Sequence, residues 1–242
     1  MLIDFAPAIW YNCFGDNMKK YKEEIIGILV LIGYLLLSTL GQEILLLLGV
    51  NRLPTPLKLI VALIYDLFIL MTIIFIYLKT IVQDFNQFKS NIKYYIDNYF
   101  KYFFLNLGLM MISNIIIINI TSINNSTNQE YITSLLGKYP LYTIIATILI
   151  APITEELIFR LNIRKIFKSN ILFIIMSGLI FGALHLAVAT SFKELLFIIP
   201  YSIPGIIFAY TLTKSKNIFV PISLHTMHNT LMILLQLLLT LK

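Results

Sequence analysis

The stretch LKLIVALIYDLFILMTIIFIYL, residues 57–78, decides the fold class of this chain. Lys58 and Asp66 are its only charged residues, and the remaining positions are apolar or weakly polar. A helix needs about 20 mainly apolar residues to cross the hydrocarbon core of a bilayer. The stretch therefore predicts a membrane-spanning helix.

The composition of the whole chain also indicates a membrane protein. Hydrophobic residues make up 59% of the 242 residues and charged residues 12%, and the mean hydropathy is +0.87. A soluble domain has about 45–50% apolar and about 25% charged residues, so this chain lacks the charges that would cover a soluble core. The net charge of +6 does not indicate nucleic-acid binding, because the basic residues flank apolar runs, as they do at a cytoplasmic membrane face.

Seven apolar runs are long enough, or nearly so, to cross a membrane as helices. The predicted fold is an all-α, polytopic transmembrane helix bundle with its catalytic core in the last four spans. Residues 1–24 are expected to form an N-terminal interfacial segment, and residues 25–242 a single transmembrane domain. Cys13 is the only cysteine, so no internal disulfide is possible. The runs cover residues 25–50, 57–78, 102–120, 141–160, 171–188, 194–212 and 218–241.

If the chain crosses the membrane seven times, its Lys and Arg residues are distributed unequally between the two sides. Thirteen of the 18 fall in the segments 19–22, 79–101, 160–168 and 214–216, which all lie on one side of the membrane, and five fall on the other. Cytoplasmic loops are enriched in Lys and Arg. We therefore expect a multi-pass protein of the cell membrane with a cytoplasmic N-terminus.

We select as candidates eight ionisable side chains among those that fall inside the apolar runs or at their ends. A charge in hydrocarbon costs at least about 2.5–3.5 kcal/mol on insertion scales, so each is a candidate functional residue. All three histidines of the chain are among them. Two of the eight stand apart from the others, and we expect these two, Glu43 and Asp66, to line the bundle interior or a water-filled cavity. The eight are Glu43, Asp66, Glu155, Glu156, Arg160, His185, His225 and His228.

Two adjacent glutamates lie in the stretch APITEELIFR, residues 151–160. Neighbouring helical residues point about 100° apart, so the two carboxylates are expected to serve different purposes. Glu156 and Arg160 are four apart in the favoured order for an ion pair, with the acid first. This pairing leaves Glu155 for another partner. The alternative is that both glutamates merely flank a cytoplasmic helix end.

The histidines lie on two later spans, in FGALH (residues 181–185) and HTMHN (residues 225–229). His185 alone is weak evidence, because taken by itself it is better interpreted as a packed histidine bonded to a backbone carbonyl. His225 and Asn229 share a helix face, and His228 lies about 60° from His225 around the helix, so it is expected to flank the same cavity. Buried polar groups need partners, and Glu155 could supply one.

The three motifs together resemble a known family. Glu-Glu-x-x-x-Arg at 155–160, Phe-x-x-x-His at 181–185 and His-x-x-x-Asn at 225–229 occur in that order on successive apolar segments. The set is similar to that of the CAAX prenyl proteases and bacteriocin-processing enzymes, also called CPBP or Abi proteins. The resemblance covers residues 139–234. Leu161 departs from it, since many members carry a small residue after the arginine.

The resemblance implies an intramembrane protease and assigns roles to its residues. Glu155 and His185 would activate the attacking water, and His225 and Asn229 would stabilise the oxyanion. Glu156 and Arg160 would be mainly structural, and His228 would support the site. The implied partners are the lipid bilayer and a membrane-associated peptide or protein substrate.

A metal-dependent mechanism is the alternative to glutamate chemistry. Glu155, His185 and His225 would make a set like the two-histidine, one-glutamate Zn sites of soluble peptidases. The helical motif His-Glu-x-x-His is absent from the chain. We therefore favour a mechanism without a metal or another cofactor, with a divalent ion such as Zn as the alternative.

Two other classes of function remain open at this stage. Membrane Glu and His residues also serve as proton relays in carriers, although no repeated halves of the kind found in transporters are present. A non-catalytic membrane scaffold is the other alternative. The composition is rich in Ile, Asn and Lys, which we interpret as bacterial, and this favours peptide maturation or bacteriocin self-immunity over processing of a prenylated protein.

Overall fold

The computed structural model describes residues 6–240, with side chains described for residues 21–41 and 43–239. This part of the chain is helical and contains no strand, which confirms the predicted all-α class. Short 3-10 turns at Val50–Arg52 (η1) and Lys193–Phe197 (η4) join some of the helices. The α-helices are α1 (Ala6–Leu47), α2 (Thr55–Ser90), α3 (Ile92–Tyr99), α4 (Lys101–Thr121), α5 (Thr127–Lys138), α6 (Pro140–Ile144), α7 (Ala151–Glu156), α8 (Ile163–Ile166), α9 (Asn170–Leu184), α10 (Ile198–Ser215) and α11 (Phe219–Thr240).

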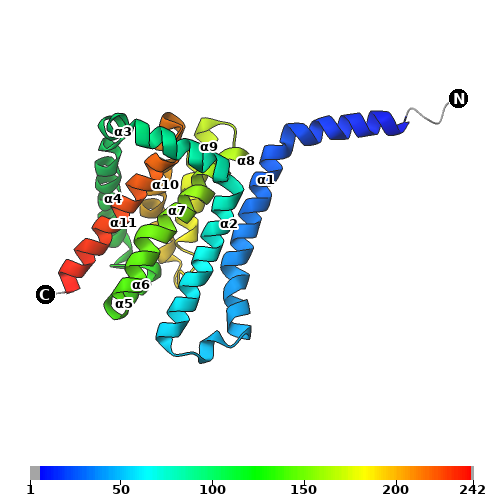
Figure 1. Ribbon diagram of the computed structural model, residues 1–242. Helices are drawn as coiled ribbons and strands as arrows, with labels where there is room; N and C mark the ends of the chain where they lie inside the picture. Colours follow the sequence, from blue (N-terminus) through cyan, green and yellow to red (C-terminus); the bar gives the residue numbers. More distant parts are fainter. Residues whose placement is uncertain (1–5, 241–242) are drawn as a thin grey trace.

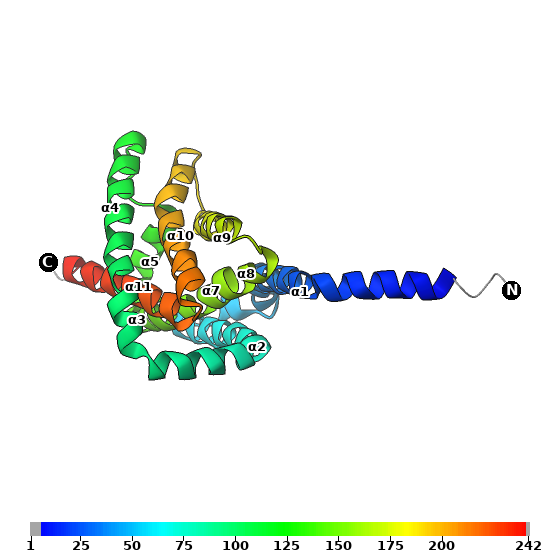
Figure 2. The same ribbon diagram turned by 90° about the horizontal axis from the view of Figure 1, so that it is seen from above.

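The long helices form an up-and-down bundle. In Figure 1, α1 and α2 lie side by side at one edge, α4 and α11 lie at the other, and α7, α9 and α10 pack between them. Figure 2 shows α10 between α4 and α9 when the bundle is viewed along its length. The first turns of α1 project away from the bundle (Figure 1). The predicted interfacial segment covers these turns and residues 1–5, which lie outside the described residues, and it stays a prediction.

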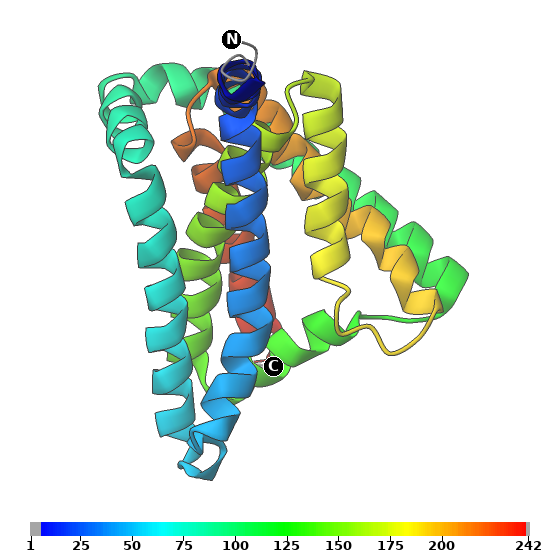
Figure 3. The same ribbon diagram turned by 90° about the vertical axis from the view of Figure 1, so that its right-hand side faces the viewer.

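Five helical segments are long and apolar enough to span a membrane by themselves. They correspond to five of the seven predicted spans, and the other two differ from expectation. The segment predicted at 171–188 ends early, because α9 has only 15 residues, about 22 Å at 1.5 Å per residue. The segment predicted at 141–160 is helical but is interrupted by π-helical turns. All seven segments nevertheless alternate in direction through the bundle, as predicted (Figure 3).

Glu43 and Asp66 differ in their surroundings. Glu43 of α1 is exposed, so the expectation that it lines the bundle interior or a cavity is wrong. Asp66 of α2 is half-buried, and neither residue lines the cavities that surround the histidines.

Three glycines allow α9 and α10 to approach each other closely. A Cβ atom on Gly205 would lie 2.7 Å from the Cα of Gly178, and one on Gly182 would lie 3.0 Å from the carbonyl oxygen of Ile198. Small residues let membrane helices approach at short distance and gain van der Waals contact. This contact fixes α9, and with it His185, against α10.

We expect Gly205→Ala to destabilise the bundle by about 1–3 kcal/mol, because the backbone atoms that a methyl group would meet cannot rotate away. Thermal unfolding in detergent measures the change. Gly108→Ala on α4 is the matched control, since a Cβ atom there meets nothing within 4 Å. Equal unfolding temperatures for the two variants would contradict the close α9–α10 contact.

Candidate active site

The two glutamates lie on a helix that is interrupted on both sides. A π-helical turn, η2 (Ile145–Ile150), precedes α7, and a second one, η3 (Leu157–Asn162), follows it. π-turns insert one extra residue into a helical turn and occur frequently at functional sites. Pro152 adds to the irregularity, because it has no N–H for the carbonyl four residues earlier. Glu155 and Glu156 therefore end a short α-helical stretch between two widened turns.

Glu156 and Arg160 form an ion pair in the protein interior. Arg160 Nε lies 3.0 Å from Glu156 Oε2, and neither side chain is exposed. Arg160 Nη1 also donates to Ser177 Oγ at 3.2 Å, and the guanidinium lies 4.8 Å from the ring centroid of Phe181. The pair expected from the four-residue spacing is therefore present, and an aromatic ring covers its cation.

His225 of α11 lies between the two glutamates. Its Nδ1 is 2.9 Å from Glu156 Oε1, and its Nε2 is 3.7 Å from Glu155 Oε2. The two carboxylates diverge, as helical geometry predicts, yet they reach opposite nitrogens of one imidazole. Glu156, predicted to be mainly structural through its pairing with Arg160, therefore also positions a site histidine.

The hydrogen-bond partners fix the tautomers of two histidines. An ionised carboxylate and a carbonyl only accept hydrogen bonds. His225 Nδ1 must therefore donate to Glu156, and His185 Nδ1 must donate to the carbonyl of Phe181, 2.9 Å away. In the neutral form of each ring, Nε2 then carries the lone pair.

Tyr201 of α10 holds the His185 ring from one side. The two rings are stacked, with centroids 4.9 Å apart and an interplanar angle of 25°. The Tyr201 hydroxyl lies 2.5 Å from Ser126 Oγ at the start of α5. His185 follows the last residue of α9. The contacts with Tyr201 therefore orient a side chain that lies just beyond the end of its helix.

Asn229 contacts the first π-helical turn. Its Nδ2 donates to the carbonyl oxygen of Thr147 at 2.8 Å. An amide nitrogen carries two hydrogens, so one donor of Asn229 remains after this bond is made. The contact also holds α11 against the helix that carries Glu155.

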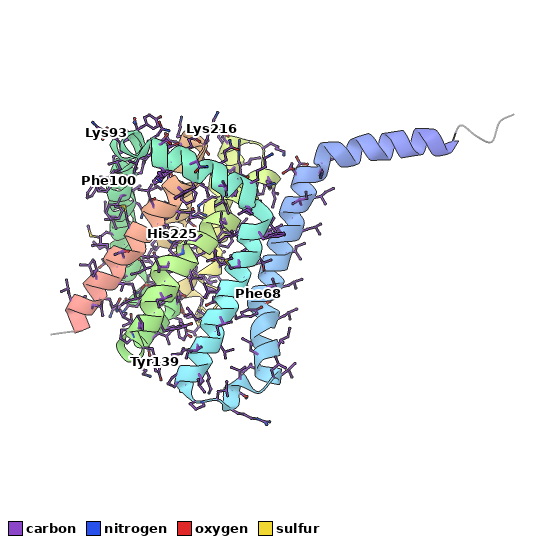
Figure 4. The ribbon with its side chains drawn as sticks, in the orientation of Figure 1. Phe68, Lys93, Phe100, Tyr139, Lys216 and His225 are labelled. Atoms are coloured by element: carbon purple, nitrogen blue, oxygen red, sulfur yellow. The ribbon has the colours of Figure 1, made fainter. Side chains whose placement is uncertain are left out.

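Two cavities meet at the histidines. The smaller, of about 120 Å³, brings together four of the residues singled out by the sequence, namely Glu155, His185, His225 and Asn229. The larger, of about 230 Å³, is lined by His185, His225 and His228. Glu155 and His185 come from successive membrane segments, and the structure brings both to one cavity. His225 lies at mid-height in the bundle (Figure 4).

His228 has a buried partner on α4. The side-chain amide nitrogen of Asn106 lies 3.1 Å from His228 Nδ1, and Asn106 has no exposed surface. His228 lines the larger cavity, as expected from its position on the helix, and does not line the smaller one. His228 and Glu155 therefore line different cavities, and His225 lines both.

Sequence reasoning missed three polar residues that contact the side chains of the site, namely Asn106, Ser177 and Tyr201. Each lies inside an apolar run, where acidic and basic residues, histidines and Asn229 were selected as candidates. A buried amide or hydroxyl must also be satisfied within the bundle. Polar uncharged residues within the spans were therefore the signal that could have found them.

The metal alternative depends on how the acidic and histidine side chains are arranged. Among residues 21–41 and 43–239, no group of three or more His, Cys, Asp or Glu side chains is arranged so that it could hold a metal ion. The alternative ligand set of Glu155, His185 and His225 lines one cavity. The Nδ1 atom of each histidine is bonded to the protein, and this leaves Nε2, as it does in histidines that bind a metal. The preference for chemistry without a cofactor stays a prediction.

One segment of the chain matches a known protein family. Residues 137–231 match the family model described as Type II CAAX prenyl endopeptidase Rce1-like. This segment, which is similar to that family, is called here the Rce1-like segment. The predicted resemblance to the CAAX prenyl proteases is confirmed for these residues, and the Rce1-like segment contains all seven residues proposed for the site.

A curated relative covers a similar share of the chain. Over 115 residues the chain is 36% identical to "Putative membrane peptidase YdiL" of Bacillus subtilis (strain 168). The match covers 46% of this chain and 44% of the relative, so the chain spans less than half the length of that protein. No solved structure matches the chain.

Proposed function

We propose that the chain is an intramembrane protease that hydrolyses a peptide bond of a membrane-associated peptide or protein. One observation carries the proposal. Glu155, His185, His225 and Asn229 come from three helices and line one cavity inside an apolar bundle. The Rce1-like segment and the printed name of the Bacillus relative support the same class of reaction.

Glu155 is the proposed base. Its carboxylate lines the cavity and is not held by Arg160, since Glu156 occupies that cation. A water between Glu155 and His185 gives a proton to Glu155 and a hydrogen bond to His185 Nε2, which orients its oxygen. The oxygen attacks the carbonyl carbon of the substrate. When the carbon–nitrogen bond breaks, Glu155 returns the proton to the leaving amine.

His225 and Asn229 are the proposed donors to the oxyanion. Asn229 retains one amide hydrogen after bonding Thr147. His225 can donate from Nε2 when it is protonated, because Nδ1 already donates to Glu156. Donors fixed before the reaction stabilise the charge that develops in the transition state.

The proposed mechanism uses no metal, so activity is expected to persist after the purified protein is dialysed against a strong chelator. The rate of peptide cleavage before and after dialysis measures this. A loss of activity that added Zn²⁺ restores would overturn the glutamate mechanism in favour of the metal alternative.

The biological setting is proposed from the charge distribution, the family resemblance and the composition. A multi-pass protein of the cell membrane, with its N-terminus in the cytoplasm, fits the distribution of Lys and Arg. A peptide substrate in bacteriocin or peptide maturation, or in self-immunity, fits the family resemblance and the composition of the chain.

The test uses purified protein in lipid vesicles with a mixture of membrane-associated peptides. Mass spectrometry detects new peptide ends, and Glu155→Gln at equal abundance is the comparison. New ends that depend on Glu155 are the expected result. Intact peptides that accumulate inside the vesicles would favour a carrier. Identical peptides with the wild type, with Glu155→Gln and with empty vesicles would favour a non-catalytic scaffold.

A further inference from the structure

The two ends of the bundle differ in charge. Helices alternate in direction, so the connections at each end can be read from the order of the elements. One end carries Lys93 and Lys216, and the other carries Tyr139 (Figure 4). Among described side chains other than the buried Arg160, ten Lys and Arg residues belong to the first end (Lys22, Lys79, Lys89, Lys93, Lys101, Arg164, Lys165, Lys168, Lys214 and Lys216), and four belong to the second (Arg52, Lys58, Lys138 and Lys193).

This asymmetry orients the protein in the membrane. Lys and Arg near the ends of membrane helices are retained on the cytoplasmic side. The end with Lys93 and Lys216, called here the basic end, is therefore the cytoplasmic one. The opposite end, which holds the loop between α4 and α5, faces away from the cytoplasm.

The larger cavity lies in the half of the bundle away from the basic end. It runs from His225 at mid-height to Asn124 and Asn125, which are exposed in the loop between α4 and α5. Its other walls come from the second half of α4, the end of α9 and the beginning of α10. No Lys or Arg lines either cavity at the histidines.

The walls of the cavity have the chemistry of a peptide-binding site. Asn114, Asn124 and Asn125 supply amides that both donate and accept hydrogen bonds. Asn114 is half-buried on α4, within a membrane span, and its side chain makes no hydrogen bond among the described residues. A polar group without a partner is costly in hydrocarbon, so this amide is expected to be satisfied from the cavity. Amides match the alternating donors and acceptors of an extended backbone.

We propose that the larger cavity admits the substrate from the face opposite the basic end, so that the substrate is an extracytoplasmic polypeptide whose backbone binds the amides of Asn114 and Asn125. The identity of the substrate rests on the proposed protease function, whereas the orientation of the protein in the membrane rests on charge and geometry. The volume of the larger cavity, about 230 Å³, is below the usual range for whole small-molecule ligands. It therefore suits a short stretch of chain that leads to His185 and His225.

Orientation is tested first, by cysteine labelling in intact cells. With Cys13→Ser as background, Asn125→Cys is placed at the cavity mouth and Lys93→Cys at the basic end. A membrane-impermeant maleimide is expected to label Asn125→Cys in intact cells, and Lys93→Cys only after the cells are permeabilised. The reverse pattern overturns the proposal and places the cavity mouth in the cytoplasm. This readout does not depend on any enzymatic activity.

Substrate binding is tested with the peptide found by the vesicle assay. Peptide added outside right-side-out vesicles is expected to be cleaved, and peptide added outside inside-out vesicles is not. Asn114→Leu is expected to raise KM by roughly 2- to 10-fold, the loss of one hydrogen bond, with kcat little changed. Cleavage only in inside-out vesicles, or an unchanged KM, overturns the substrate assignment. Absence of cleavage in both orientations overturns the proposed function, while the labelling result stands.

Discussion

Replacing Glu155 by glutamine is expected to lower kcat/KM by about 10²- to 10⁴-fold, the usual contribution of a positioned general base. Glutamine has nearly the same size and keeps the wall of the cavity intact, but it cannot take a proton from water. The loss should therefore fall on kcat, with KM little changed. Steady-state cleavage of the identified peptide by the purified variant measures both constants.

The fold of this variant should be unaffected, and this is what makes the result interpretable. Glu155 is partly exposed to the cavity, and its contact with His225, at 3.7 Å, is longer than a hydrogen bond. Glu43→Gln is the matched control, since Glu43 is an exposed glutamate on α1 that lines neither cavity. If Glu155→Gln cleaved the peptide as fast as Glu43→Gln, Glu155 would not be the base.

Most of the fold follows from where the apolar runs begin and end. Five predicted spans match five long helices, and the sidedness expected from Lys and Arg stays a prediction. The segment predicted at 171–188 was too long because its last residues are apolar but not helical. There the side chain of Glu194 accepts the backbone N–H of Thr190 at 2.9 Å and that of Thr127 at 2.5 Å. Hydropathy alone cannot distinguish an apolar loop held in this way from a helix.

The π-helical turns were beyond sequence reasoning for a different reason. One extra residue in a turn shifts the helix face without changing which residues are apolar. This shift places Glu155 and Glu156 so that both reach His225. Helical spacing correctly separated the two glutamates and paired Glu156 with Arg160, because a four-residue interval is a local property. The contact of Glu156 with His225 joins residues 69 positions apart in the chain, and no local spacing encodes it.

The pairing of Glu156 with Arg160 leads to the largest expected effect on stability. Arg160→Met would leave the Glu156 carboxylate without its cation at a site with no exposed surface. Breaking a buried ion pair by removing one partner costs about 3–5 kcal/mol, since the remaining charge stays desolvated. We expect a much lower unfolding temperature in detergent and little protein in the membrane. Glu23→Gln is the matched control, because Glu23 pairs with Lys165 with 55% of its side chain exposed, and such pairs contribute only about 0–1 kcal/mol.

A double replacement separates the two roles of Glu156. Glu156→Leu with Arg160→Met removes both charges, and apolar replacements of buried pairs are often neutral or stabilising. We therefore expect the double variant to regain the stability that Arg160→Met loses. It should remain inactive, because His225 Nδ1 would have no carboxylate to orient the ring. Recovered stability together with recovered cleavage would show that Glu156 serves only to neutralise Arg160. An Arg160→Met variant as stable as Glu23→Gln would contradict the buried pair itself.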